Sequence, residues 1–547
     1  MALRQGLQKS GDVPMVSSVS SSSSSGGTLA AVEAATPRFA CMKGAKLGLV
    51  AGSSWHLDFK LEPLTWNALS GTLDDTLHAH TGSAHGSRDA IRTQARADLH
   101  EHTPEFLAES SYTFGKQASR LARLALVSAQ LEDELTSSEA VARLTSELDP
   151  WLLGSNRNSL VYDLTWGGLV TTDGVASQGA DYGMGWYNDH HFHFGYLVYA
   201  AAAVAHFDPS FFSRSSVNGT NRRSGVLAMA LDICNPPPSG APPAWSSASA
   251  PSSPFFPVTR MKDWFDGHSW ASGLFPMNNG KSQESVSEAA NAYYACALLG
   301  GALQATDELD AREELDPTTA AAAAATDADV AAADADVATV DEGGAAAATA
   351  GNPTTREATE SISDPADPEE VLATSDAEVV ILGGDPARLK ATARLLFAME
   401  VSAAKRYWQV SLHEGDEVYP PTFVAANRMV GIVGGGDVVA RTWFGAEIEY
   451  VHCINMLPFT PATSHLLGKE FVAEEFPSIQ GRANTAQEAW RGFIFQNQAV
   501  IDPLEAWENL VGLYGTEIDG TATGAQVDDG TSLAVMLYWT ATRPPVL

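Results

Sequence analysis

Cysteine is scarce in this chain of 547 residues. The four cysteines, Cys41, Cys234, Cys296 and Cys453, lie far apart and form no CxxC pair. That spacing excludes a zinc ribbon and a dense disulfide scaffold. Cys296 and Cys453 lie in apolar stretches, which favours buried thiols over a bridge.

Long apolar runs are also missing. No uninterrupted stretch of about 18 apolar residues occurs, so no membrane span is expected. Residues 1–27 contain no apolar core of the kind found in secretory signals and lead into a serine tract. The compartment is therefore not readable from the chain itself.

Basic residues are outnumbered two to one. Lysine and arginine total 33 against 66 aspartates and glutamates, which gives a formal net charge of −33. Such a chain repels nucleic acid and anionic membranes, so neither is an expected partner. A neutral polymer remains compatible, although most of the acidity is expected to be solvated surface.

Two stretches lack the residues needed for a core. Residues 1–38 are rich in serine and glycine, and residues 304–384 are mostly alanine, threonine and acidic residues with no Trp, Tyr or Phe. We expect disorder in the first and a solvated low-complexity insert in the second, dispensable for chemistry.

The rest of the chain predicts a mainly α protein. Residues 39–105 are interpreted as a β-rich remnant and linker, with strands expected at 46–50 and 55–61. From residue 110 the apolar period becomes helical. Periodic apolar residues from 114 to 127 predict a first helix, and further helices are predicted near 137–153, 189–207, 224–234, 285–303, 386–410, 445–457, 485–501 and 531–542. Residues 106–303 and 385–547 are therefore expected to form one helical domain interrupted by the insert.

Acidic and aromatic residues gather in two segments. The segment 260–296 is expected to start a helix that carries both Glu284 and Glu288, and their four-residue spacing predicts that they share one helical face. The segment 181–199 carries Asp189. Aromatic rings stack on pyranose rings while carboxyl groups act on the glycosidic oxygen and on water. The combination indicates a glycoside hydrolase.

The motifs themselves resemble glycoside hydrolase family 81, the inverting endo-β-1,3-glucanases. They are DLTWGG from Asp163, WYNDHHFHFGY from Trp186, KDWFDGHSWASG from Lys262, QESVSEA from Gln283, NRMVG from Asn427, TWFG from Thr442, EYVHCINMLP from Glu449 and QAVIDP from Gln498. The resemblance implies an (α/α)6 barrel, preceded by a β-sandwich that is shortened here. It also implies endo-hydrolysis of a β-1,3-glucan such as laminarin or callose, and an extracellular or cell-wall location.

Inversion needs one protonated carboxyl and one ionised carboxylate, about 6.5 to 9.5 Å apart with water between them. By resemblance, Asp189 is the general acid, Glu288 the general base and Glu284 a supporting carboxylate. Structural alternatives exist: Asp189 could cap a helix, and Ser285 with Glu288 fits a capping box.

Further residues are candidates for substrate contact. His193 is expected to bond substrate or orient the acid, because it lies one helical turn beyond Asp189. His190, His191 and His193 do not share one helical face, so neither a metal nor another cofactor is expected. Other candidate contacts, some of which should prove to be turn or core residues, are Asp163, Trp166, Trp186, Tyr187, Asp263, Trp264, Asp266, His268, Trp270, Tyr293 and Trp443.

Two alternatives to this hydrolase stay open. A polysaccharide lyase on the same scaffold would require basic residues for uronate, which the motifs lack. A catalytically silent β-glucan-binding protein is the alternative from another class. A monomer is expected in either case.

Overall fold

The structure is a computed structural model. It describes residues 59–61, 63–67, 84–102, 110–238, 253–275, 280–315, 385–412, 418–515 and 525–544, together with three strands at 2–5, 38–40 and 46–50. Helices dominate these residues, so the prediction of a mainly α protein is confirmed.

The longer helices are α3 (Ala84–Glu101), α4 (Ser111–Gln130), α5 (Glu134–Leu152), α7 (His190–Phe207), α8 (Val217–Cys234), α9 (Val286–Leu315), α12 (Pro386–Ala403), α16 (Lys469–Ile479), α17 (Glu488–Gln498), α18 (Pro503–Tyr514) and α19 (Leu533–Ala541). Shorter α-helices are α6 (Thr172–Ala176), α13 (Pro421–Ala426), α14 (Ile448–Cys453) and α15 (Thr463–Leu466). There are also 3₁₀ helices η1 (Ala180–Trp186), η2 (Pro209–Phe212) and η5 (Gln480–Asn484), and a π-helix η4 (Ala404–Trp408), in the described residues. Many helices begin at a residue whose side chain binds a free backbone N–H: Ser110 accepts from Thr113 and Asp502 from Glu505.

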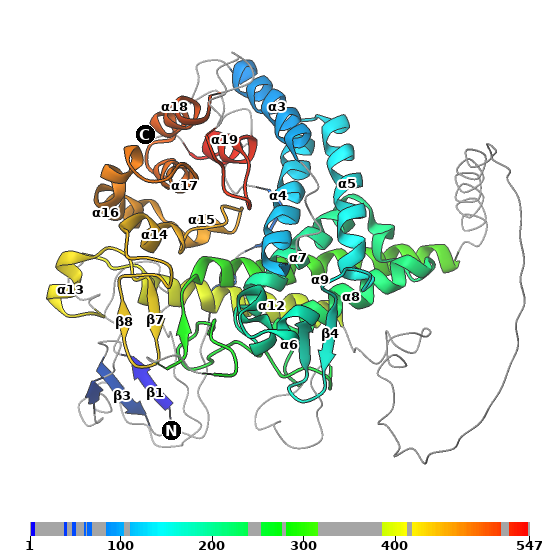
Figure 1. Ribbon diagram of the computed structural model, residues 1–547, viewed down its shortest axis with the longest axis horizontal. Helices are drawn as coiled ribbons and strands as arrows, with labels where there is room; N and C mark the ends of the chain where they lie inside the picture. The colour runs from blue at the N-terminus through cyan, green and yellow to red at the C-terminus, as the bar shows by residue number, and fades with distance from the viewer. Residues whose placement is uncertain are drawn as a thin grey trace, which may run out of the picture.

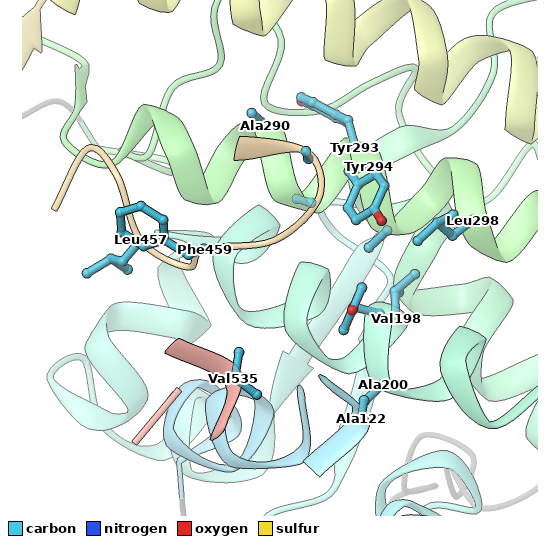
Figure 2. Close-up of a cluster of buried hydrophobic side chains, with 14 of the residues drawn as sticks. Ala122, Val198, Ala200, Ala290, Tyr293, Tyr294, Leu298, Leu457, Phe459 and Val535 are labelled. Atoms are coloured by element: carbon cyan, nitrogen blue, oxygen red, sulfur yellow. The ribbon is translucent and has the colours of Figure 1, made fainter. Parts of the chain in front are cut away.

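Helix α7 forms the centre of the first half of the domain. Every residue from His190 to Ala205 is buried, so the helix has no solvent face. It packs against α4, α5, α8 and α9, and α9 in turn packs along α12. Figure 2 shows part of this core, where Val198 of α7 lies near Tyr294 and Leu298 of α9, and Ala200 of α7 lies near Ala122 of α4.

The chain closes on itself. Helix α19 packs against both α3 and α4, which places the last described helix beside the first two of the helical domain (Figure 1). Helices α14 to α18 lead from the middle of the domain to this junction. Closure buries side chains of α4 and α19 that would otherwise face water.

Three small antiparallel sheets accompany the helices. Strands β1 (Ala2–Gln5) and β2 (Arg38–Ala40) both pair with β3 (Lys46–Val50), and β4 (Leu160–Asp163) pairs with β5 (Gly168–Thr171). The third sheet joins β6 (Ser282–Gln283), β7 (Ile432–Gly434) and β8 (Val438–Val439). Strand β6 matters most, because it directly precedes α9.

Comparison with the sequence shows agreements and omissions. The strand expected at 46–50 is present as β3, whereas most of the strand expected at 55–61 lies outside the described residues. Helices α3, α16 and α18 are not predicted, and α3 lies inside the stretch interpreted as β-rich. The expectations for residues 1–38 and 304–384 fall mainly outside the described residues, although β1 lies in the first and α9 extends into the second as far as Leu315.

Candidate active site

Glu284 does not lie on the helix that carries Glu288. Strand β6 ends at Gln283 and α9 begins at Val286, so Glu284 occupies the junction between them. The prediction that both carboxylates share one helical face is therefore wrong. Its physical reason is that Ser282 and Gln283 pair with Gly434 and Val433 of β7, which keeps the chain extended up to this point.

Glu288 is held from two neighbouring helices. Its Oε1 accepts a hydrogen bond from the Tyr112 hydroxyl at 2.8 Å and from the Tyr196 hydroxyl at 2.9 Å. Glu288 is buried, with 3% of its surface exposed. Burial raises the pKa of Glu288, while hydrogen bonds from Ser285 and the tyrosines and the charge of Lys116 act in the opposite direction.

Glu284 is more accessible and has a different partner. It is partly exposed, and its Oε1 accepts the backbone N–H of Trp443 at 2.7 Å. Burial, followed by the charge of Glu288, raises the pKa of Glu284 to about 7, against the effect of the Trp443 N–H. A carboxyl with this pKa exchanges protons readily near neutrality.

Asp189 directly precedes α7, at the N-cap position, but its side chain does not cap the helix. Its side chain makes no capping hydrogen bond, and its backbone has a left-handed φ of 58°. The Asp189 N–H donates to the Ala271 carbonyl at 2.9 Å, which ties it to the loop before β6. Burial, and then the charges of Glu284 and Glu288, raise the pKa of Asp189 well above its ordinary value. The capping alternative is therefore not supported, and the three carboxyls influence one another.

The segment that leads to Asp189 has a strained backbone. Asp181, Tyr182 and Tyr187 also have left-handed φ angles, of 49°, 57° and 66°. This conformation costs a residue other than glycine about 1 to 2 kcal/mol. Asp181 is held by the start of α4, because its carboxylate accepts from the hydroxyls of Ser110 and Ser111 at 2.8 and 2.6 Å.

The three histidines have separate environments. His193 is fully buried; its Nδ1 lies 2.7 Å from the Ser111 hydroxyl, and burial lowers its pKa to about 4. His190 is bound by Asp232 at 2.6 Å and by the Met184 carbonyl at 2.9 Å, whereas His191 lies beside Gln283. His193 therefore contacts Ser111, which also binds Asp181. A contact between His193 and substrate stays a prediction.

The predicted acids of the loop at 260–275 bind the loop itself. Asp263 accepts the N–H groups of Phe265 and Asp266 and the indole N–H of Trp270, as a turn residue does. Asp266 is partly buried, 4.0 Å from the ring of His268, which is itself fully buried.

Beneath this loop lies a buried ion pair. Lys262 Nζ lies 2.6 Å from Glu400 Oε2, and neither side chain is exposed. Glu400 also accepts the Ser269 N–H, and Lys262 also donates to the Gly267 carbonyl. Two points of the loop, Lys262 and Ser269, are thereby fixed to Glu400 of α12.

The predicted stacking aromatics separate into two groups. Tyr187 and Tyr293 are 1% and 0% exposed, so they are core residues and offer no free ring face. Trp166, Trp264 and Trp443 are 52%, 41% and 51% exposed and can meet a ligand. Trp186 and Trp270 are partly buried. Asp163 accepts the Tyr187 hydroxyl at 3.1 Å, which indicates a structural contact.

Several residues around the site are not predicted from the sequence. Tyr112 and Tyr196 hold Glu288, and Lys116 lies one helical turn after Tyr112. Tyr182 is 61% exposed and its ring meets that of Tyr112 edge-on at 5.4 Å. Polar residues recurring inside an otherwise apolar helix are the only sequence signal that marks Tyr112 and Lys116.

The described residues contain no group of three His, Cys, Asp or Glu side chains arranged to hold a metal ion. Among the helices described, none is long and apolar enough to cross a membrane.

Comparison with known proteins gives the following relatives. A glucan endo-1,3-beta-D-glucosidase of Glycine max is 25% identical over 90% of this chain and 57% of its own length. The primary septum glucan endo-1,3-beta-D-glucosidase of Schizosaccharomyces pombe is 26% identical over 83% of this chain and 35% of its own length. The chain thus spans at most little more than half of these relatives.

A solved structure supports the fold. A glycoside hydrolase family 81 protein from Clostridium thermocellum matches with a TM-score of 0.56 and 19% identity over 92% of this chain and 52% of that one. The expected (α/α)6 architecture is confirmed by this likeness. The profile of the glycosyl hydrolase family 81 C-terminal domain matches residues 83–327 and 368–539. This chain therefore belongs to glycoside hydrolase family 81.

Proposed function

We propose that the chain is an endo-acting β-1,3-glucan hydrolase that inverts the anomeric centre, with laminarin or callose as substrate. The observation that carries the proposal is the group formed by Asp189, Glu284 and Glu288: the charges of both glutamates raise the pKa of Asp189, and the charge of Glu288 raises that of Glu284. Relatives named glucan endo-1,3-beta-D-glucosidase support the linkage.

Asp189 is the general acid. Its pKa is raised by burial and by the neighbouring charges, which favours the protonated carboxyl that delivery of a proton to the leaving oxygen requires. None of the described residues donates a hydrogen bond to the carboxyl, so both oxygens are available to a substrate.

The general base belongs to the pair Glu284 and Glu288. The resemblance assigns it to Glu288, but the bonding favours Glu284 as the carboxylate that meets water. Glu288 is buried and two tyrosine hydroxyls occupy its Oε1, whereas Glu284 is partly exposed and one backbone N–H binds it. Glu288 then acts as a neighbouring negative charge that raises the pKa of Glu284.

The exposed aromatics provide the sugar contacts. Trp443 adjoins Glu284 through its N–H, and Trp264 and Trp270 belong to the loop whose Ala271 carbonyl binds Asp189. Stacking on such rings favours a neutral polysaccharide, consistent with the net charge of −33.

The first test is release of reducing sugar from laminarin, with β-1,4-glucan as the control substrate. Asp189→Asn should lower kcat by about 10²- to 10⁴-fold, the usual contribution of a general acid. Proton NMR should show the α-anomer as the first product. Binding of laminarin without release by the unaltered chain would favour the silent binding protein instead.

Azide separates the two glutamates. In the variant that lacks the base, azide can replace water as nucleophile and form an α-glucosyl azide. We expect rescue in Glu284→Gln and none in Glu288→Gln. Rescue confined to Glu288→Gln would return the base to Glu288, as the resemblance implies.

A further inference from the structure

Two small cavities near Glu288 share part of their walls. The smaller, about 10 Å³, is bordered by Glu288, Asn291 and Tyr196, and the larger, about 40 Å³, by Trp66, Gln130 and Trp539. Both are bordered by Arg123, Tyr199 and Thr460. The smaller volume is near the minimum for one water, whereas the larger admits a bigger occupant.

Arg123 is an unusual residue for this position. It is 4% exposed, and among the described residues no carboxylate lies within ion-pair distance of its guanidinium. One Nη donates to the Gly530 carbonyl, while Nε is buried without a partner. Asp528, an acid whose charge acts on Arg123, is already paired with Lys116 at 2.8 Å. A buried cation in this state is costly unless something supplies negative charge.

The other polar groups of the larger cavity already have partners. Gln130 accepts the Tyr538 hydroxyl, Trp539 donates to the Gln496 carbonyl, and Thr460 donates to Asn291. In the described part of the chain, the Tyr199 hydroxyl has no hydrogen-bond partner. The unused groups are therefore donors: the Arg123 Nε–H and the Tyr199 O–H.

We propose that the larger cavity binds a small monovalent anion of the size of chloride, held by Arg123 and Tyr199. The apolar remainder of the wall, including Leu126, Val127 and Val535, suits a weakly hydrated anion better than a multiply charged one. The site is separate from the carboxyls that the proposed function uses.

Anion binding and the protonation of Glu288 should affect each other, because Arg123 and Glu288 both border the smaller cavity. The titratable and charged groups that face Glu288 are Tyr112, Lys116 and Arg123 of α4, Tyr196 of α7, and Asp189 and Glu284, with Asp528 behind Lys116. An added negative charge disfavours ionised Glu288, so by reciprocity the anion binds less tightly as Glu288 loses its proton.

The test measures chloride binding without using activity. The melting temperature of the full chain is followed while sodium chloride replaces sodium gluconate at constant ionic strength, and ³⁵Cl NMR line width reports binding directly. We expect a saturable rise in Tm of a few degrees in chloride and a line broadening that gluconate does not reverse. Raising the pH should weaken binding, and Glu288→Gln should remove that pH dependence.

Variants decide the location of the site. Arg123→Gln and Tyr199→Phe should abolish or weaken the chloride response. Arg223→Gln is the matched control, since Arg223 is also buried but pairs with Asp307 and borders neither cavity. Equal responses in Arg123→Gln and the unaltered chain, or no chloride response at all, would overturn the proposal and leave the cavities to water. If Arg123→Gln does not fold, Tyr199→Phe carries the same decision.

Discussion

At the scale of single residues, the site depends on carboxyls that are kept from ionising freely. The pKa values of Asp189, Glu284 and Glu288 are all raised, and burial is the largest cause for each. Such an arrangement is unfavourable to the folded chain at neutral pH, because carboxyls that would ionise freely in the unfolded chain lie close together in a poorly solvated region. The cost is acceptable where it provides a proton donor and an acceptor at the same pH.

Glu284 gives a prediction about stability and pH. Its folded pKa of about 7 exceeds the ordinary 4.5, so folding is favoured when Glu284 is protonated and loses that contribution as pH rises through 7. Glu284→Gln should therefore match the unaltered chain below pH 4.5 and exceed it in free energy of unfolding above pH 7. Urea denaturation across this range measures the difference.

A matched substitution controls for the general effect of removing charge. Glu139→Gln changes an exposed carboxylate paired with Arg143 on the surface of α5. Its effect should stay within about 0.5 kcal/mol at every pH. A parallel pH dependence in both variants would show that the shift at Glu284 is not local.

The sequence identifies the acids better than their partners. Spacing and neighbouring motifs single out Asp189, Glu284 and Glu288, but Tyr112 reaches Glu288 from 176 positions away and Tyr196 from 92. Tyr187 and Tyr293 illustrate the converse error, since a buried ring and an exposed one look alike in a sequence. Tertiary packing, which a single sequence does not contain, decides both.

At the scale of elements, the loop at 260–275 is held from below by α12. Lys262 and Glu400 are both fully buried, and each also bonds the loop backbone. Removing one partner leaves an uncompensated charge in the core. The loop should therefore depend on a residue that lies more than 100 positions downstream of it.

Glu400→Ala should destabilise the chain by about 3 to 5 kcal/mol, as measured by urea denaturation. The double variant Lys262→Met with Glu400→Leu should recover much of that loss, because no charge is then left buried. Breaking the surface pair between Arg143 and Glu139 should cost less than about 1 kcal/mol. A Glu400→Ala loss no larger than this control would show that the pair is solvated.

The strained segment before α7 allows a test at one exposed position. Tyr182 has φ of 57°, which glycine adopts freely and alanine does not. Tyr182→Gly and Tyr182→Ala both lose the ring that meets Tyr112. Because only glycine relieves the backbone, the Gly variant should be the more stable by about 1 kcal/mol. Equal stabilities would mean that the segment relaxes without cost.

Helical periodicity predicts the buried helices of this fold well and its short ones poorly. The predicted helix at 189–207 matches α7 within one residue at its start, since nearly all of it is apolar. Glu284 is misplaced because a two-residue strand is too short to leave a periodic signal. Helix α3 has a polar sequence with low mean hydrophobic character, so its packing against α19 is not apparent from residues 84–101 alone.

At the scale of the whole molecule, the domain is continuous despite its interruption in sequence. Helices α9 and α12, which precede and follow residues 316–384, pack directly on each other. The family profile likewise leaves residues 328–367 unmatched. The segment between the two helices is therefore not needed to bring them together.

Replacing residues 320–380 by a flexible linker of about 20 residues should leave kcat on laminarin within about twofold, and Tm nearly unchanged, because long loops cost little extra closure entropy. The matched control exchanges the same residues for a scrambled sequence of equal composition. A large loss of activity in the deletion alone would assign the segment a role in catalysis.

Lys116 is held by Asp528, which lies 412 positions further along the chain, and its ammonium is among the charges that favour ionised Glu288. During synthesis, Glu288, Tyr112 and Tyr196 are therefore present long before Lys116 can pair with Asp528. A nascent chain that does not yet contain Asp528 would hold every proposed reactive group and still lack the charge that pairs with Lys116, so competence should arrive only after Asp528 has been added.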